Sequence, residues 1–221
     1  MVWPRGTMEF IGTERFALEL FGTMASASAR ERTGGNVPLD DKSGRVPVAL
    51  TVLALEGIRP RSVPLKFTYT EVLWRIGVVI RKKPAWLIVA ADVDQPLARG
   101  IIRFLLSYPT RSARIDISES ARNVEVGLRV GDVAMSVRAE LNTMSPPAPE
   151  KRMLVARDGA RFFKVPWGAA APNSRQGAYV TVTDAGLGTE TLAAAVEWEE
   201  SGTVWRMREH LCGTAEVLQL I

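Results

Sequence analysis

The chain has 221 residues, with 28 Lys and Arg against 24 Asp and Glu. One His and one Cys exclude disulfide frameworks and multi-histidine or thiolate zinc sites, which leaves only carboxylates as metal ligands; no metal and no cofactor are expected. The net charge of +4 is spread without the basic run of a phosphate-binding stripe, so nucleic acid is not expected as a partner. No apolar stretch approaches the ~20 residues of a membrane span, and the first residues lack the apolar core of a secretory signal, which predicts a cytoplasmic protein without a membrane partner.

Strand patterns dominate the first part of the chain. Apolar and polar residues alternate with a period of two, which is typical of strands that bury one face. A polar, glycine-containing stretch, Ala25–Gly44, interrupts this pattern and is expected to be a loop. Strands are predicted at Phe16–Phe21, Val46–Leu55, Ser62–Tyr69, Leu73–Ile80 and Trp86–Ala91.

One segment has the 3.6-residue period of a helix instead. Its apolar residues fall on one helical face, and Asp94-Gln95-Pro96 supplies an N-cap followed by a proline near the first turn. Pro109 ends the pattern. We therefore predict one amphipathic helix over Asp94–Ser107.

Strand patterns return after this helix. Gly131-Asp132 predicts a two-residue hairpin turn, and Glu200-Ser201-Gly202 predicts a second hairpin between 192–199 and 203–209. The proline-containing stretch Asn142–Arg152 is expected to be an exposed connection within one domain that spans residues 1–221. Further strands are predicted at Ala113–Ser118, Asn123–Val130, Val133–Leu141, Arg161–Val165 and Tyr179–Thr183. Such a number of strands points to a large antiparallel sheet, a sandwich or a closed barrel.

Three short motifs occur in the order and spacing of a known family. Tyr69-Thr70-Glu71 lies in a strand pattern, Ser107-Tyr108-Pro109-Thr110-Arg111 follows the predicted helix, and Pro4-Arg5-Gly6 lies near the start. With these motifs the chain resembles the acetoacetate decarboxylase family over roughly residues 3–120. The resemblance implies a mainly antiparallel β domain, closed or cone-shaped as a barrel, with one or two helices and room for a small ligand.

The chain departs from that family where the family's chemistry takes place. The resemblance places an imine-forming lysine at Thr110 and a second lysine at Arg111. A threonine hydroxyl cannot form an imine with a ketone, and a guanidinium with a pKa above ~12 offers no free amine. A family arginine falls on Thr13, while Arg15 is two positions away and would share that strand face.

Other lysines are poor replacements. Lys66 has the opposite strand parity from Glu71, so it should point away from it. Lys164 remains open as a relocated imine lysine, although a strand lysine usually faces water.

The resemblance, in which a Tyr-Thr-Glu strand supplies an active-site glutamate, makes Glu71 the main candidate for chemistry, as a general acid or base beside a cavity. The alternative is a structural ion pair with Arg111, Arg103 or Arg15. The residues expected at the site are Glu71 and Thr110 for the reaction and Arg111, Arg15, Tyr108, Tyr69, Thr13 and Arg103 for the substrate.

Several other residues have side chains that can act in catalysis or metal binding. Glu56 is either a second carboxylate or, more in keeping with its position, a surface turn residue. His210 and Cys212 share one strand face and are interpreted as a packed pair rather than metal ligands. Trp167, Trp198 and Trp205 are expected in the core, and 184–188 as a turn rather than a phosphate loop.

Together these features predict a protein that binds a small carboxylate or keto acid inside the barrel. Arg111 would hold the acid group and Glu71 would exchange a proton, without imine-based decarboxylation. Enolisation, hydration and hydrolysis are the lyase-like or hydrolase reactions open to such a site. The alternatives are a non-catalytic binding or oligomer-forming module and a residual decarboxylase that uses Lys164. A homo-oligomer is also expected.

Overall fold

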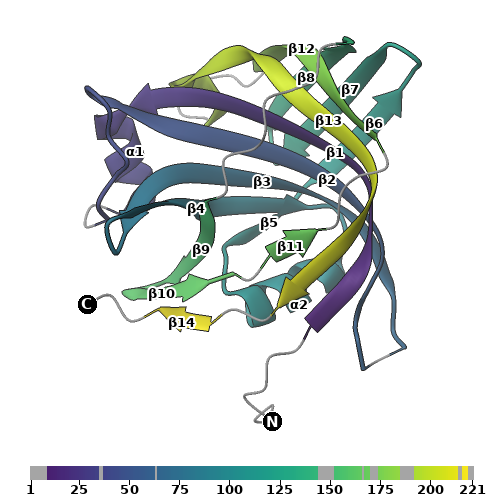
Figure 1. Ribbon diagram of the computed structural model, residues 1–221, viewed down its shortest axis with the longest axis horizontal. Coiled ribbons are helices and arrows are strands. Elements are labelled where there is room, and N and C mark those ends of the chain that lie inside the picture. The colour runs from purple at the N-terminus through teal and green to yellow at the C-terminus, as the bar shows by residue number, and fades with distance from the viewer. Residues whose placement is uncertain are drawn as a thin grey trace.

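The computed structural model describes residues 9–34, 37–62, 64–143, 152–165, 167–169, 174–184, 192–213 and 216–218. Pro4–Gly6 lies outside these residues, as do most of the predicted connection at 142–152 and of the predicted turn at 184–188. Strands make up most of the described chain, as predicted (Figure 1).

The elements follow one another in this order: β1 (Glu9–Ala25), α1 (Ser26–Thr33), β2 (Arg45–Pro60), β3 (Phe67–Ile80), β4 (Lys83–Val93), α2 (Pro96–Leu106), β5 (Thr110–Ser112), β6 (Arg114–Glu119), β7 (Asn123–Val130), β8 (Val133–Leu141), β9 (Met153–Asp158), β10 (Arg161–Lys164), β11 (Trp167–Ala169), β12 (Ser174–Asp184), the 3-10 turn η1 (Ala193–Ala195), β13 (Val196–Gly213) and β14 (Glu216–Leu218).

These strands form a single sheet with the order β14-β10-β9-β4-β3-β2-β1-β13-β12-β8-β7-β6. Neighbours are antiparallel except where β4 pairs with β9 and with β5. The predicted closed barrel is not confirmed, because the pairing in the described residues runs from β14 to β6 without joining these two ends.

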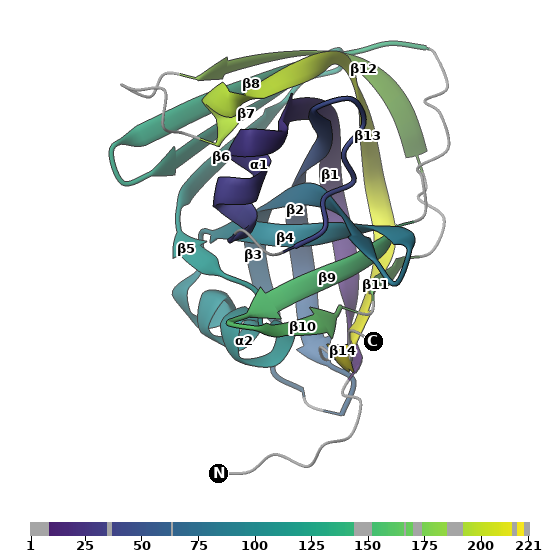
Figure 2. The same ribbon diagram turned by 90° about the vertical axis from the view of Figure 1, so that its left-hand side faces the viewer.

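The long central strands separate two cores. Figures 1 and 2 show β6, β7, β8 and β12 at one end of the molecule and β9, β10, β14 and α2 at the other, with β1 to β4 between them. Leu53 and Leu73 face the core that contains Ile102 of α2. Val52 and Val72, one residue away, face the other core. Burial on both faces explains the nearly continuous apolar run predicted as the strand Val46–Leu55.

Three predictions about elements need correction. The segment Ala25–Gly44 contains α1, which was missed because its buried residues, Ala29 and Thr33, do not form an apolar stripe. Glu200-Ser201-Gly202 is not a hairpin turn, since β13 continues through it and pairs with β1 on both sides of a bulge. Strand β3 begins at Phe67 rather than Ser62.

The predicted helix and first hairpin are present. Helix α2 is capped by the Gln95 side chain, which accepts a hydrogen bond from the Ala98 backbone. Asp94 instead accepts one from the Thr70 backbone, at 2.8 Å. Gly131 has a positive φ of 58° in the turn between β7 and β8, as its place in the hairpin demands.

Gly202 leaves no room for a side chain. A Cβ there would lie 2.7 Å from Val180 Cγ2 and 3.0 Å from the Glu19 carbonyl oxygen. We expect Gly202→Ala to lower the free energy of unfolding by about 1–3 kcal/mol, because the crowded strands must separate. Gly100→Ala is the matched control, since a Cβ in that exposed turn of α2 meets nothing within 4 Å; it should stabilise by up to about 1 kcal/mol. Equal urea midpoints for the two variants would contradict this account.

Candidate functional site

Glu71 lies inside the molecule on β3. It shares a strand face with Tyr69 and Leu73, and this face lines the core that α2 covers. The residue is only 3% exposed. Tyr108, which follows α2, is hydrogen-bonded to the carboxyl group, while Glu71 Oε2 is buried without a partner. Glu71 is therefore a buried acid with one oxygen still free to bind something.

The surroundings of Glu71 favour its neutral form. Burial raises its pKa to about 8, with further upward contributions from the charges of Glu14 and Asp94. The hydrogen bond with Tyr108 acts in the opposite direction and is too weak to reverse the shift. At neutral pH most molecules thus carry a proton on Glu71 that can be donated to a ligand.

Thr110 and Arg111 point to opposite faces of the sheet. β5 lies beside β4 with Thr110 opposite Ala91 and Arg111 opposite Asp92. Ala91 belongs to the core that contains Tyr69, so Thr110 faces the same side of the sheet as Glu71. The Thr110 hydroxyl is buried and has no hydrogen-bond partner.

Arg111 is not beside Glu71, which corrects the prediction that it holds a ligand's acid group there. Its Nε and Nη2 donate to the two carboxylate oxygens of Asp92 at 2.6 and 2.9 Å. Asp92 is fully buried and also accepts a hydrogen bond from Trp74 Nε1 at 2.8 Å. Because the parity of β5 turns its side chain away, Arg111 serves as the counter-charge of a structural carboxylate.

Two other predicted cations also lie away from Glu71. Arg15 is exposed in a bulge of β1, and Arg103 is exposed on α2. Thr13 pairs with Glu56 and Glu209, both exposed, so it belongs to the outer face of β1. Glu56 is thus a surface residue, as its position suggested.

Lysine side chains of the described chain all lie on the surface. Lys66 is exposed, as its parity predicted. Lys164 is exposed as well, on the opposite face of β10 from Phe163, which packs on the core beside Glu71. Every described lysine is exposed: Lys42, Lys66, Lys82, Lys83 and Lys164.

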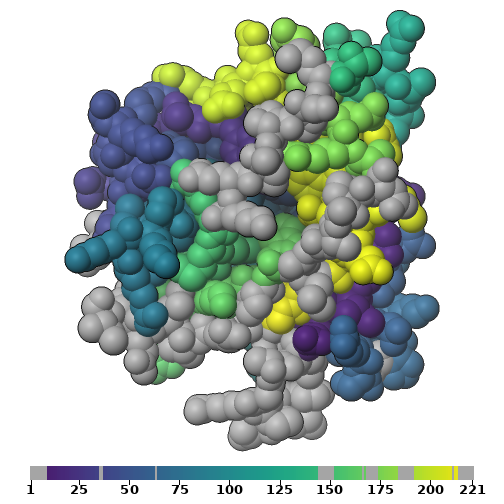
Figure 3. All heavy atoms as spheres, in the orientation of Figure 1, coloured from purple at the N-terminus to yellow at the C-terminus, as the bar shows by residue number. Residues whose placement is uncertain are grey.

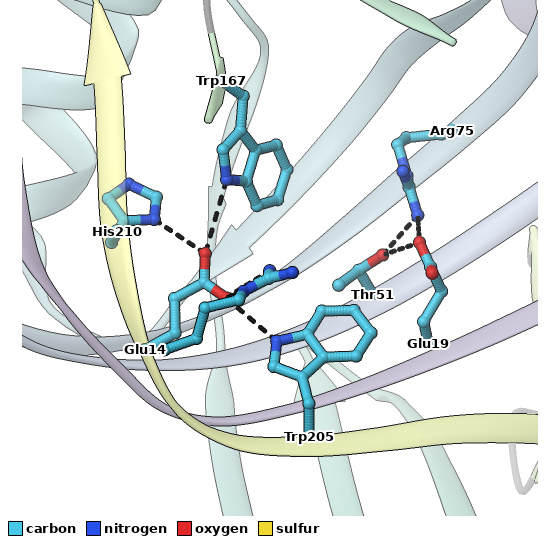
Figure 4. A network of polar contacts seen from close by, with 8 residues as sticks. Glu14, Glu19, Thr51, Arg75, Trp167, Trp205 and His210 are labelled. Carbon is cyan, nitrogen blue, oxygen red and sulfur yellow. Dashed lines mark hydrogen bonds and ion pairs between the residues drawn. The ribbon is translucent and has the colours of Figure 1, made fainter. Parts of the chain in front are cut away.

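A second buried carboxylate, Glu14, was missed by the sequence analysis. Residue Arg15 is an extra residue in β1 relative to β2, so Glu14 turns inward between Thr13 and Arg15. Four side chains of β11 and β13 surround it (Figure 4). Its partners are Arg208 Nε at 2.6 Å, His210 Nδ1 at 2.9 Å, Trp205 Nε1 at 3.0 Å and Trp167 Nε1 at 3.4 Å.

These partners keep Glu14 ionised. Burial alone would raise its pKa, but the hydrogen bonds from His210 and Trp205 and the charge of Arg208 outweigh burial and lower it. At neutral pH Glu14 is therefore ionised, whereas Glu71 in the same interior is mostly neutral. The pair of nearby carboxyl groups, one charged and one neutral, is a common feature of acid/base sites.

A small cavity of about 30 Å³ lies beside these groups. Tyr69, His210 and Cys212 are its polar lining residues, and α2 supplies an apolar wall of Ala98, Ile101, Ile102, Leu105 and Leu106. Phe10, Ile58 and Phe67 complete the lining. Figure 3 shows the start of β1 in purple, the β2–β3 connection in blue and the end of β13 in yellow at one corner of the molecule. The prediction that His210 and Cys212 share a face is confirmed, since both border the cavity.

Figure 4 also shows another buried polar group in the same interior, further along β1. Arg75 Nη2 donates to Glu19 Oε1 at 2.6 Å and to the Thr51 hydroxyl. The Arg75 guanidinium lies 5.5 Å from the centre of the Trp86 ring. Together the ion pair with Glu19 and the hydrogen bond to Thr51 link three neighbouring strands, β1, β2 and β3.

The described residues contain no cluster of three or more His, Cys, Asp or Glu side chains that could hold a metal ion. Within the same residues, no helix is long and apolar enough to cross a membrane.

Comparisons with known proteins give a clear result for the fold alone. No family model and no curated protein matches the sequence. An acetoacetate decarboxylase from Legionella pneumophila superposes with a TM-score of 0.73 at 10% identity, covering 99% of this chain and 92% of its own. An acetoacetate decarboxylase-like enzyme from Sphingomonas wittichii RW1 gives 0.70 at 12% identity, covering 96% and 94%. The chain has the acetoacetate decarboxylase fold.

A third structure with this fold contains a ligand. The enduracididine biosynthesis enzyme MppR, in complex with pyruvate, superposes with a TM-score of 0.65 at 14% identity, covering all of this chain and 93% of its own. The resemblance found in the sequence motifs is thus supported by the three-dimensional structure, which places Glu71 and Thr110 on one face of the sheet.

Arg111→Ala should destabilise the fold. We expect the free energy of unfolding to fall by about 2 kcal/mol, because buried Asp92 loses its counter-charge while water partly replaces it. Arg114→Ala is the matched control, since its pair with Asp116 is exposed on both sides; its loss should cost at most about 0.5 kcal/mol. Urea unfolding measures both losses of stability; equal losses for Arg111→Ala and Arg114→Ala would contradict the structural role of Arg111.

Glu71 should make stability depend on pH. The unfolded chain releases this proton near 4.5 and the folded chain near 8. Wild-type stability should therefore fall as pH rises between these values and level off above 8, because the unfolded state alone gains an ionised group. Glu71→Gln lacks this ionisable group, so between pH 5 and 8 its free energy of unfolding should rise relative to that of the wild type by as much as about 4 kcal/mol. A flat difference, as expected for the exposed control Glu56→Gln, would contradict the raised pKa.

Proposed function

We propose that this protein binds a small keto acid or related carbonyl compound beside Glu71 and catalyses proton transfer on it, without forming an imine. The observation that carries the proposal is the pair of buried, unpartnered oxygens on one face of the sheet, Glu71 Oε2 and Thr110 Oγ1. Buried polar atoms rarely lack partners, so two of them on the same face of the sheet favour a bound polar ligand.

The choice of proton transfer follows from the groups present. Imine chemistry needs an amine, and the described lysines are all exposed. A neutral Glu71 carboxyl can donate its proton to a carbonyl oxygen and so stabilise the negative charge that develops during enolisation. Thr110 can donate a second hydrogen bond to the same ligand. Enolisation is thus the reaction that these groups support best.

The choice of ligand class rests on the fold and on the size of the cavity. MppR shares this fold and its structure was determined with pyruvate. The cavity of about 30 Å³ must widen even for a three-carbon acid, which argues against larger ligands, and its lining combines three polar residues with apolar ones. A ligand with one apolar end and one carbonyl group fits this lining.

Deuterium exchange into pyruvate tests the proposal. In D2O the wild-type chain should speed the exchange of the pyruvate methyl protons, followed by proton NMR. Glu71→Gln should reduce this rate at least about 100-fold with little change in pyruvate affinity, because an amide cannot donate and regain the proton. Glu56→Gln should exchange as wild type does.

Two outcomes would overturn the proposal. Borohydride added with pyruvate should leave the mass of the chain unchanged, and a lysine adduct would show that an imine forms. Pyruvate that binds without any exchange would rule out the acid/base reaction and favour the non-catalytic binding module.

A further inference from the structure

His210 is the single histidine of the chain, and one of its two ring nitrogens is hydrogen-bonded to a carboxylate. His210 is buried on β13, and its Nδ1 lies 2.9 Å from Glu14 Oε1. Within the described residues, no hydrogen bond is formed by its Nε2. The ring also packs against Trp167 with a centroid distance of 5.9 Å, which limits its rotation.

Glu14 determines which ring nitrogen carries the proton. Its carboxylate is held in the ionised form by Arg208 and the two tryptophan N–H groups, so it can only accept hydrogen bonds. Nδ1 must therefore carry a hydrogen that it donates to Glu14. In a neutral ring, Nε2 is then the basic nitrogen with a free lone pair.

The His210 side chain borders the cavity. His210 lines it together with Cys212, which follows two residues later on the same strand face, and with Tyr69. Glu71 is close enough to Cys212 for its charge to act on the thiol. The Glu71 carboxyl on β3 acts electrostatically on two lining residues, Tyr69 and Cys212, so it lies close to the cavity that the imidazole borders from β13.

We infer that His210 is the proton acceptor of this site, with Nε2 directed at the ligand and Glu14 as the positioning residue that fixes its tautomer. This inference rests on the proposed function and adds the base that it lacks. Nε2 takes a proton from the carbon next to the carbonyl, and the C–H electron pair forms the C=C bond. The carbonyl π pair moves to oxygen, which takes the proton of Glu71. The products are an enol, an imidazolium and a carboxylate, and the reverse step restores both groups.

Other groups around the cavity are poor bases. Burial and the nearby Glu71 raise the pKa of the Cys212 thiol to about 12. Burial, followed by the charge of Glu71, also raises the pKa of Tyr69 and of Tyr108 well above 10. These groups remain protonated at neutral pH and leave the imidazole as the acceptor.

His210→Asn is the decisive variant. The asparagine amide can keep the hydrogen bond to Glu14 in the place of Nδ1–H, but it has nothing in the place of Nε2. We expect the deuterium exchange rate of pyruvate to fall at least about 100-fold with little change in affinity. Glu209→Gln, on the outer face of β13, is the matched control and should exchange as wild type does. Wild-type exchange by His210→Asn would overturn the inference.

Nitrogen NMR of the single imidazole provides a readout that does not depend on catalysis. In the full ¹⁵N-labelled chain at neutral pH, Nδ1 should carry the hydrogen, and pyruvate should shift the Nε2 resonance. Glu14→Gln should populate the second tautomer, since an amide can accept or donate at that place. A hydrogen on Nε2, or an Nε2 resonance that pyruvate leaves unchanged, would overturn the inference.

The two sets of variants separate this inference from the proposed function. Loss of exchange in Glu71→Gln but not in His210→Asn would leave the proposed function standing and remove His210 from it. A wild-type chain without exchange would overturn the proposed function, together with the proton-acceptor role. An Nε2 resonance that still shifts with pyruvate would then show ligand contact alone.

Discussion

A carboxylate inside an apolar core stays ionised only if enough hydrogen-bond donors surround it, and Glu14 has four such donors from β11 and β13. The free energy needed to bury this charge is offset in part by Arg208, which lies directly opposite Glu14 on the adjacent strand β13. Its presence then acts on the rest of the interior. A second negative charge nearby is unfavourable, which contributes to the neutral state of Glu71. The state of each acid group thus depends on the other.

The fold gives this site its rigidity. Glu14, Glu71 and His210 all lie on long strands that pair with neighbours on both sides. Only the α2 wall belongs to an element with few neighbours, and Leu97 and Phe104 on its outer face are 68% exposed. The polar groups on the strands are therefore fixed, while α2 is the part that can shift when the cavity enlarges to admit a ligand.

Local patterns in the sequence predicted the elements that follow simple rules. The period of two predicted most strands, and the proline-bounded apolar face predicted α2. The spacing from Glu71 to Thr110 predicted two residues that do face the same side of the sheet. Helix α1 was missed because it has no apolar stripe, and Gly202 was misread because a bulge and a turn favour the same small residues.

The residues of the site could not be identified from the alternation of apolar and polar residues alone. Arg111 was assigned to the ligand because it stands where the resemblance places a second lysine, yet its side chain and that of Thr110 face opposite sides of the strand. Glu14 escaped notice because the alternation of β1 breaks at Arg15. The only available signal was the series Arg208, His210 and Cys212 at alternate positions, which places three polar side chains together on one buried face.

The extra residue in β1 has a wider consequence for how such proteins diverge. One insertion within a strand exchanges the inward and outward sets of side chains beyond it, so a new acid can enter a core without any substitution at the old positions. Met207 of β13, with a φ of 52°, lies between the same two residue pairs as Arg15, so both strands are irregular at this point. A chain with one residue fewer here would turn Glu14 to the other face of β1 and leave Arg208 and the buried His210 without their shared acceptor.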